Sequence, residues 1–145
     1  MARILDIQKR SNQYLADFDV NVIGVIEAIG QQTVDFNRAQ MLAHKDADGK
    51  PLIHKRTGVE TLSKAYAKKT GKTKPDLYVS GAFQDAMFLV MQDIKDYTIS
   101  SDDALVQYLP GNYGKIFGVD LDNQPKAQDI NDKAIIDDYM KSVFQ

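Results

Sequence analysis

Two histidines and the aspartates between them are the residues of this chain best suited to chemistry. His44 and His54 flank a turn that contains Asp46 and Asp48. Such a cluster could bind zinc, or the histidines could serve as an acid–base pair. They stand at opposite ends of a loop, however, and not at the i, i+4 spacing of helical zinc ligands. The pattern favours solvent-exposed loop histidines over a metal or catalytic site.

The loop over residues 44–52 also has alternating aspartates, which raises a calcium-site interpretation. An EF-hand needs further oxygen donors before its glycine and a glutamate six residues after it. Aligning Gly49 with that glycine puts His44 at the first ligand position and Lys55 at the last. A polar turn that stops the preceding helix is therefore the favoured interpretation.

Activated nucleophiles are not evident in this sequence. The chain has no cysteine, which excludes disulfides, thiolate metal sites and a cysteine nucleophile. None of its serines lies in a G-x-S-x-G elbow, and Gly71 and Gly81 lack the strand–loop–helix order of a phosphate cradle. We therefore expect no enzyme, no catalytic residue, no metal and no cofactor. Carboxylates near the centre are expected to hydrate strand ends and turns; these are Asp85, Asp93, Asp96, Asp102 and Asp103.

Length and composition are those of one ordinary globular domain. The chain has 145 residues, of which 43% are hydrophobic and 26% charged, and its net charge is −2. Without a basic excess, direct nucleic-acid binding is disfavoured. The most apolar windows, residues 20–29 and 86–91, are too short to span a bilayer, and the N-terminus lacks the apolar core of a secretory signal. We expect no membrane partner, and synthesis in the cytoplasm.

A hairpin at about residues 83–101 is the element around which the chain is organised. Period-two patterning is clear in its second arm, where Tyr97 and Ile99 alternate with polar residues. Ser80-Gly81 signals a chain reversal just before the first arm. That arm could be covered on both faces, because most of its residues are apolar. The apolar residues at its odd positions are Phe83, Met87, Leu89 and Met91, with Asp85 as the exception.

Helical spacing predicts helices on both sides of this hairpin. Residues 4–18 form an N-terminal arm, and residues 20–44 a single long helix whose Gly24 and Gly30 hint at close packing by another backbone. A short helix around residues 61–69 should end near Gly71. The last helix should span residues 131–144, capped by Asn131 or Asp129. Its predicted inward stripe is Ile136, Tyr139, Met140 and Val143.

The remaining segments are predicted to be shorter or irregular. Residues 100–103 should cap a helical turn over residues 104–109, which Pro110-Gly111-Asn112 then breaks. Residues 116–119 form either a third short strand or an apolar loop. Residues 120–129, which include Pro125, read as a surface loop.

The fold class expected is α+β: a long N-terminal helix and a C-terminal helix packed on a small antiparallel β-sheet. We expect one domain over residues 1–145, with residues 1–18 as a candidate arm and residues 19–145 as the core.

Three stretches of the chain resemble bacteriophage tail-completion and virion-morphogenesis proteins, which include head–tail connector and neck proteins. Residues 37–52 read NRAQMLAHKDADGKPL, a helix end followed by a D-A-D-G-K-P-L turn. Residues 62–83 read LSKAYAKKTGKTKPDLYVSGAF, similar to the L-S-x-x-Y … S/T-G-x-[LF] run of these families. Residues 98–120 contain Tyr113-Gly114 to Phe117, similar to their Y-[AG]-x-x-[HF] segment. The tryptophan common near the first motif is missing, since the chain has none.

This resemblance implies a structural virion protein, located in the neck or at the top of the tail. Such proteins form cyclic ring homo-oligomers and contact other virion proteins such as the portal, a connector or the tail tube. Complementary patches on opposite flanks would close such a ring. Our candidate subunit-interface residues are Ile4, Ile7, Leu15, Phe18, Lys64, Tyr66, Lys68, Tyr113, Phe117, Asp120 and Asn123.

A basic run suggests an alternative function. Lysines are frequent between Lys64 and Lys74, and this segment could meet an acidic partner or a nucleic-acid backbone. A solvated helix face explains the same residues without a partner. The alternative is therefore a small nucleic-acid-binding or other phage accessory module.

Overall fold

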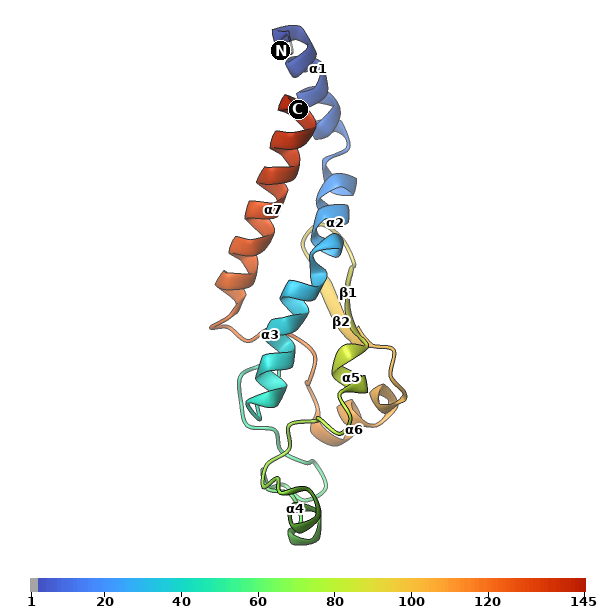
Figure 1. The fold of residues 1–145 in the computed structure, drawn as a ribbon, viewed down its shortest axis with the longest axis vertical. Coiled ribbons are helices and arrows are strands. Elements are labelled where there is room, and N and C mark those ends of the chain that lie inside the picture. The colour runs from blue at the N-terminus through green and yellow to red at the C-terminus, as the bar shows by residue number, and fades with distance from the viewer. Residues whose placement is uncertain (1–2) are drawn as a thin grey trace.

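Helices dominate the computed structural model, which describes residues 3–145 and confirms the α+β class (Figure 1). Its elements are, in order, α1 (Ile4–Ala16), α2 (Phe18–Ala28), α3 (Gly30–Leu42), α4 (Lys64–Thr70), α5 (Ala82–Asp85), β1 (Met87–Met91), β2 (Tyr97–Ser101), the 3₁₀-helix η1 (Ala104–Gln107), α6 (Leu109–Tyr113) and α7 (Gln124–Phe144). The molecule is elongated, and α1 lies near the end of α7 at one end of the long axis.

The predicted hairpin is present as the antiparallel pair β1–β2, with Leu89 opposite Ile99. Met87, Leu89 and Met91 are buried on one face of β1, whereas Val90 on the other face is 39% exposed. The first arm is therefore covered mainly on one face, and the idea that both faces could be buried is wrong.

The hairpin is shorter than predicted because Phe83 belongs to a helical turn, α5, and not to a strand. Gly81 starts this turn with φ +87°, in the left-handed region that glycine adopts without strain. Phe83 is 2% exposed and its ring lies 5.8 Å from that of Phe117. It thus fills the core from the helix side, which period-two patterning cannot distinguish from a strand position.

The single long helix predicted for residues 20–44 is instead two helices, α2 and α3, which meet at Ile29. A Cβ atom on Gly30 would lie 3.2 Å from the Leu89 Cβ, closer than ordinary packing. The missing side chain thus lets α3 approach β1. The packing role suggested for the two glycines is confirmed for Gly30 and wrong for Gly24, where a Cβ atom would meet no neighbouring atom within 4 Å.

Two buried amides on α3 hold the apolar segment over residues 116–119. Asn37 donates to the Ile116 carbonyl at 2.8 Å and accepts from the Gly118 amide at 3.0 Å. Gln40 donates to the Gly118 carbonyl at 3.1 Å and accepts from the Asp120 amide at 2.9 Å. The segment is therefore an ordered loop, the second of the two predicted alternatives.

Both predicted breaks involving proline fall inside helices. Pro110 lies in the first turn of α6 and Pro125 in the first turn of α7. A helix tolerates proline there because the amides of its first turn have no partner within the helix. Asp103 does cap the turn before α6, accepting from the Leu105 amide at 2.9 Å.

The last helix begins before its predicted cap, Asn131, which is buried on α7 and 7% exposed. The predicted inward stripe is only partly correct. Val143 is buried, but Ile136 is 60% exposed and Met140 48% exposed. The predicted surface loop over residues 120–129 shrinks to the few residues before Gln124.

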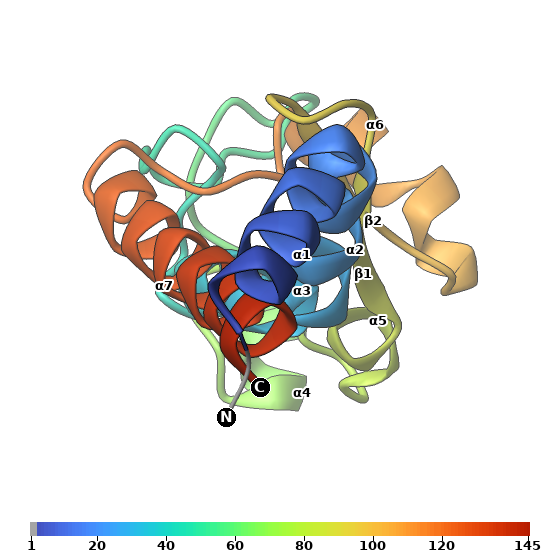
Figure 2. The same cartoon turned by 90° about the horizontal axis from the view of Figure 1, so that it is seen from above.

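The elements form three layers (Figure 2). Helices α1, α2 and α3 follow one another along the long axis, with the hairpin on one side and α7 on the other. Helices α2 and α3 lie directly on β1, and α7 packs on α1, α2 and α3. Within residues 3–145, no helix combines the length and apolar character needed to cross a membrane.

Candidate assembly surfaces

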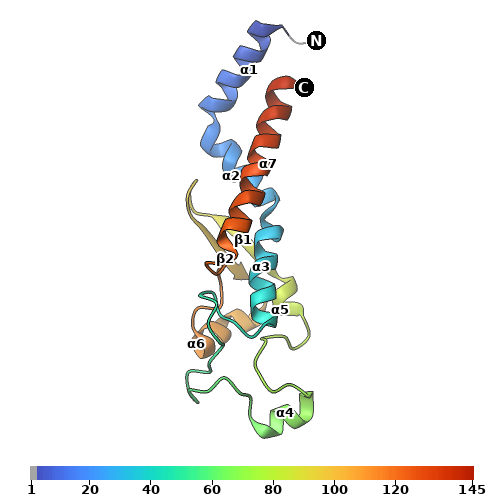
Figure 3. The ribbon, with the colours of Figure 1, turned by 90° about the vertical axis from the view of Figure 1, so that its left-hand side faces the viewer.

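Helix α1 and the C-terminal half of α7 form a two-helix stalk that rises above the hairpin (Figure 3). Tyr14 is the buried residue of α1, and its hydroxyl donates to the Asp138 carboxylate at 2.9 Å. Its ring meets Tyr139 edge-on at 5.2 Å, and Ser11 bonds the Tyr139 hydroxyl at 2.9 Å. The predicted N-terminal arm is thus fixed to α7.

Burial and the neighbouring carboxylate change the acidity of the stalk tyrosine. Loss of solvation raises the pKa of Tyr14 to about 12, and the hydrogen bond and charge of Asp138 add to this. The phenol therefore stays protonated and continues to donate to Asp138 over the whole neutral range.

Large apolar side chains remain uncovered on the outside of α1. Ile4 is 83% exposed and Leu15 57% exposed, while the predicted interface residue Ile7 is half-buried. Phe18, at the start of α2, is 37% exposed. We call the exposed set Ile4, Leu5, Leu15, Phe18 and Val20 the α1 surface. Ile4 and Leu5 lie at the start of α1, and Leu15, Phe18 and Val20 lie where α1 ends and α2 begins. Groups of exposed large apolar side chains are candidates for interaction sites.

At the opposite end, a cavity of about 350 Å³ lies between α4, the segment after it, and α6. The structure brings together here two predicted interface residues, Tyr66 and Tyr113, which both line it. His54 and Tyr78 complete the aromatic wall, and His54 meets Tyr113 edge-on at 5.2 Å. Desolvation raises the pKa of Tyr113, and the nearby Tyr66 phenol adds to this.

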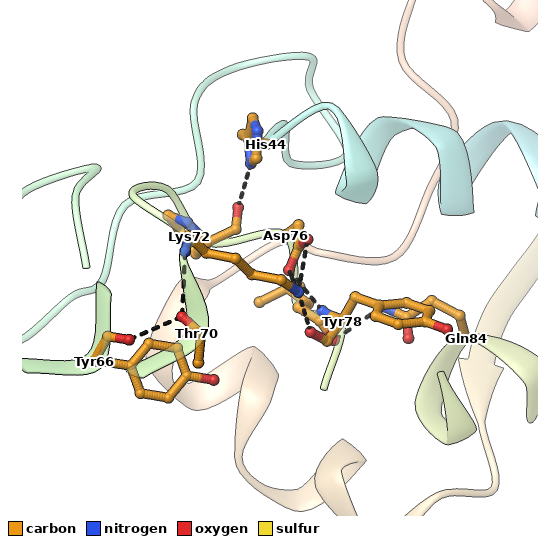
Figure 4. A network of polar contacts seen from close by, with 9 residues as sticks. His44, Tyr66, Thr70, Lys72, Asp76, Tyr78 and Gln84 are labelled. Carbon is orange, nitrogen blue, oxygen red and sulfur yellow. Dashed lines mark hydrogen bonds and ion pairs between the residues drawn. The ribbon is translucent and has the colours of Figure 1, made fainter. Parts of the chain in front are cut away.

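Lys72 fixes the loop that forms one wall of this cavity (Figure 4). Its ammonium group pairs with the Asp76 carboxylate at 3.0 Å, donates to the Tyr78 carbonyl at 2.6 Å, and lies 5.3 Å from the centre of the Tyr78 ring. Gln84 donates to the Leu77 carbonyl at 2.9 Å from the other side. The wall is therefore built by contacts within the protomer and is preformed.

Both histidines make contacts with the surrounding chain. The prediction that they are solvent-exposed is wrong, since both are half-buried. His44 Nδ1 lies 3.0 Å from the Pro75 carbonyl, which can only accept, so this nitrogen donates. Between residues 3 and 145 there is no group of three acidic, histidine or cysteine side chains placed to hold a metal.

The basic run is partly neutralised. Lys72 is paired with Asp76, and Lys74 lies 3.8 Å from Glu60. Lys64 and Lys68 are exposed on α4. Ser63 caps this helix, accepting from the Tyr66 amide at 3.2 Å, and Gly71 ends it with φ +73° as predicted.

Three of the predicted interface residues lie elsewhere. Phe117 packs on Phe83 in the core, and Asp120 is 7% exposed. The Asp120 carboxylate accepts from the Asn123 amide at 2.9 Å, which turns the chain into α7. Phe117 and Asp120 therefore shape the protomer from within, and Asn123 is half-buried beside them.

Sequence reasoning missed the outward residues of α7. Ile136 and Met140 were assigned to the inward stripe, although a second set at i, i+4 spacing, through Ala127 and Asn131, is the one that is buried. The sequence of α7 contains two sets of residues at i, i+4 spacing, and this pattern was the signal that one of the sets could face outward.

Comparisons of the chain with protein-family models, curated proteins and solved structures found no match.

Proposed function

We propose that this protein is a structural virion subunit of a tailed phage, forming a ring in the neck or at the top of the tail. The observation that carries the proposal is the α1 surface, where an elongated protomer leaves large apolar side chains on a rigid stalk. The resemblance in residues 37–120 gives the proposal its virion context. Neither feature requires the protein to catalyse a reaction.

The α1 surface fits a subunit contact for physical reasons. Ile4 and Leu15 each keep more than half of their area in contact with water. Covering such side chains contributes about 25 cal/mol per Å² of apolar area. Because Tyr14 and Ser11 fix α1 to α7, a neighbour would bind a preformed surface and lose little conformational entropy.

The test is virion incorporation of variants with one changed residue on the α1 surface. Leu15→Asp places a charge in the contact, and we expect it to lower the amount of protein in purified virions at least tenfold. Gln32→Asp, at an exposed polar position of α3 outside the α1 surface, is the matched control and should be incorporated normally. Circular dichroism should show both variants folded. Virions that lack the wild-type protein would refute the proposal.

The alternative, a nucleic-acid-binding module, depends on the exposed lysines of α4. The ion pairs of Lys72 and Lys74 reduce the charge available there. A salt-dependent affinity for duplex DNA that is lost in Lys64→Glu/Lys68→Glu would favour this alternative over the virion subunit.

A further inference from the structure

The outward face of α7 is an unpartnered surface with its own pattern. In Figure 3 this helix lies in front of the other elements along the length of the stalk. Ile136, Met140 and Phe144 are spaced i, i+4, i+8 and are 60%, 48% and 49% exposed. Residues at this spacing form one ridge on a helix surface.

A second exposed ridge, next to the apolar one, carries charges of alternating sign. It consists of Asp129, Lys133, Asp137 and Lys141, all exposed. Each apolar residue lies three positions after one of these charges, so the two ridges run side by side. The outward face of α7 therefore combines an apolar stripe with a row of side-chain charges in the order minus, plus, minus, plus.

This order is complementary to itself when the helix is reversed. An antiparallel copy centred on residue 135 places Asp129 opposite Lys141 and Lys133 opposite Asp137, each pair occurring twice. A parallel copy in register places every charge opposite an identical one. Ridges at i, i+4 spacing pack into the matching grooves of another helix in the commonest class of helix contact.

We infer that α7 binds α7 of a second copy of this chain in antiparallel orientation, about a twofold axis near residue 135. The charge order selects this occupant, because a twofold contact uses the same patch on both subunits. Ring neighbours stand side by side in parallel, so this contact is distinct from the one proposed for the α1 surface. The inference does not depend on the ring.

The size of the face sets the strength of the pair. With the axis at residue 135, Ile136, Met140 and Phe144 lie opposite Ala134, Ile130 and Lys126 of the other copy, so the apolar ridge does not meet itself. The three half-exposed side chains offer at most roughly 300 Å² of apolar area per copy, below the ~800 Å² per partner of a standard stable interface. We therefore expect a dimer that forms reversibly at micromolar concentration. Its mass should rise with concentration from 16.3 kDa toward twice that value. Sedimentation velocity over a concentration series measures this change.

Charge reversal tests the orientation. Lys133→Asp and Asp137→Lys each place like charges opposite one another at two positions, and each should weaken the dimer at least tenfold. The double variant Lys133→Asp/Asp137→Lys restores the opposite-charge pairs and should recover the wild-type dissociation constant. Lys9→Asp, the same change on the exposed side of α1, is the matched control and should leave the mass unchanged.

Cross-linking gives a second readout that does not depend on charge. The chain has no cysteine, so Ile136→Cys introduces a single thiol close to the proposed axis. Oxidation should join two copies through residue 136, whereas Lys9→Cys should stay monomeric under the same conditions. A wild-type protein that stays monomeric at 100 µM, or a double variant no better than the single ones, would overturn the inference. Virion incorporation is read separately, so the two proposals can fail independently.

Discussion

The hydroxyl of Tyr14 on α1 donates a hydrogen bond of 2.9 Å to the carboxylate of Asp138 on α7. This bond joins two residues from opposite ends of the chain, and Tyr14 is only 6% exposed. Together with the edge-on contact between Tyr14 and Tyr139, it makes the two terminal helices one rigid stalk. The contact proposed for the α1 surface depends on that rigidity.

Tyr14→Phe should lower the free energy of unfolding by about 1–2 kcal/mol. The ring and its contact with Tyr139 remain, so the loss reports the hydrogen bond to the carboxylate, which is left without its buried donor. Urea unfolding followed by circular dichroism measures it. Tyr108→Phe is the control, since Tyr108 is 62% exposed, and its effect should stay within about 0.5 kcal/mol. Equal effects in the two variants would contradict a special role for the Tyr14 hydroxyl.

Stability should fall as the pH rises from about 10 to about 12. The pKa of Tyr14 is about 12 in the folded protein and near 10 in the unfolded chain. In this range the unfolded chain loses its proton first, so it binds fewer protons and unfolding becomes easier. Below pH 10 the contribution is fully present. Burial also raises the pKa of Tyr97 and of Tyr113, which act in the same direction.

Comparison with Tyr14→Phe isolates the contribution of one tyrosine to this alkaline decline. The variant lacks the titrating group, so its stability should fall less steeply than that of the wild type over the same pH range. Urea midpoints at several pH values provide the comparison. Parallel curves for the two proteins would show that the Tyr14 phenol does not titrate as proposed.

Local patterns in the sequence predicted the fold class and the hairpin, because period-two alternation around Ile99 reports a one-sided sheet directly. They failed where a tertiary contact decides the outcome. The helix breaks at Ile29, next to Gly30, whose close approach to Leu89 involves a residue far along the chain that local spacing does not reveal. Pro110 and Pro125 were interpreted as breakers, yet a proline in a first turn starts a helix as readily as it ends one.

The candidate surfaces were predicted only in part, for a similar reason. Exposed Ile4 and Leu15 lie on a helix whose inward face was not known from spacing alone. Ile136 and Met140 were placed inward because apolar residues at helical spacing usually are. The packing of α1, α2 and α3 on α7 shows which side of α7 is covered. The cavity beside Tyr113 needs segments that are distant in sequence.

Two glycines on neighbouring helices should respond oppositely to added side chains. Gly24→Ala should raise the free energy of unfolding by about 0.5–1 kcal/mol, because residue 24 is exposed within α2 and alanine favours the helix. Gly30→Leu should lower it by roughly 1–3 kcal/mol, since its first side-chain atom already lies 3.2 Å from the Leu89 Cβ. Urea unfolding measures both, and a stabilising Gly30→Leu would refute the close approach of α3 to β1.

Asn37→Leu should be among the most destabilising single changes on α3. The Asn37 side chain is fully buried and forms hydrogen bonds to the Ile116 carbonyl and the Gly118 amide. Leucine has a similar volume but leaves both backbone groups unpaired in the core, at a cost of about 2–4 kcal/mol. The exposed neighbour Gln32→Leu is the control and should change the free energy of unfolding by less than about 0.5 kcal/mol.

Hydrogen exchange at the Gly118 amide separates this explanation from a general packing defect. If Asn37 holds the loop over residues 116–119, the Gly118 amide should exchange much faster in Asn37→Leu than in the wild type. The amides of β1 should exchange faster only to the extent that global stability falls. Unchanged protection at Gly118 would mean that Ile116 and Val119 hold the loop through apolar packing alone. The loop would then be ordered by packing in the core and not by the hydrogen bonds of Asn37 and Gln40 on α3.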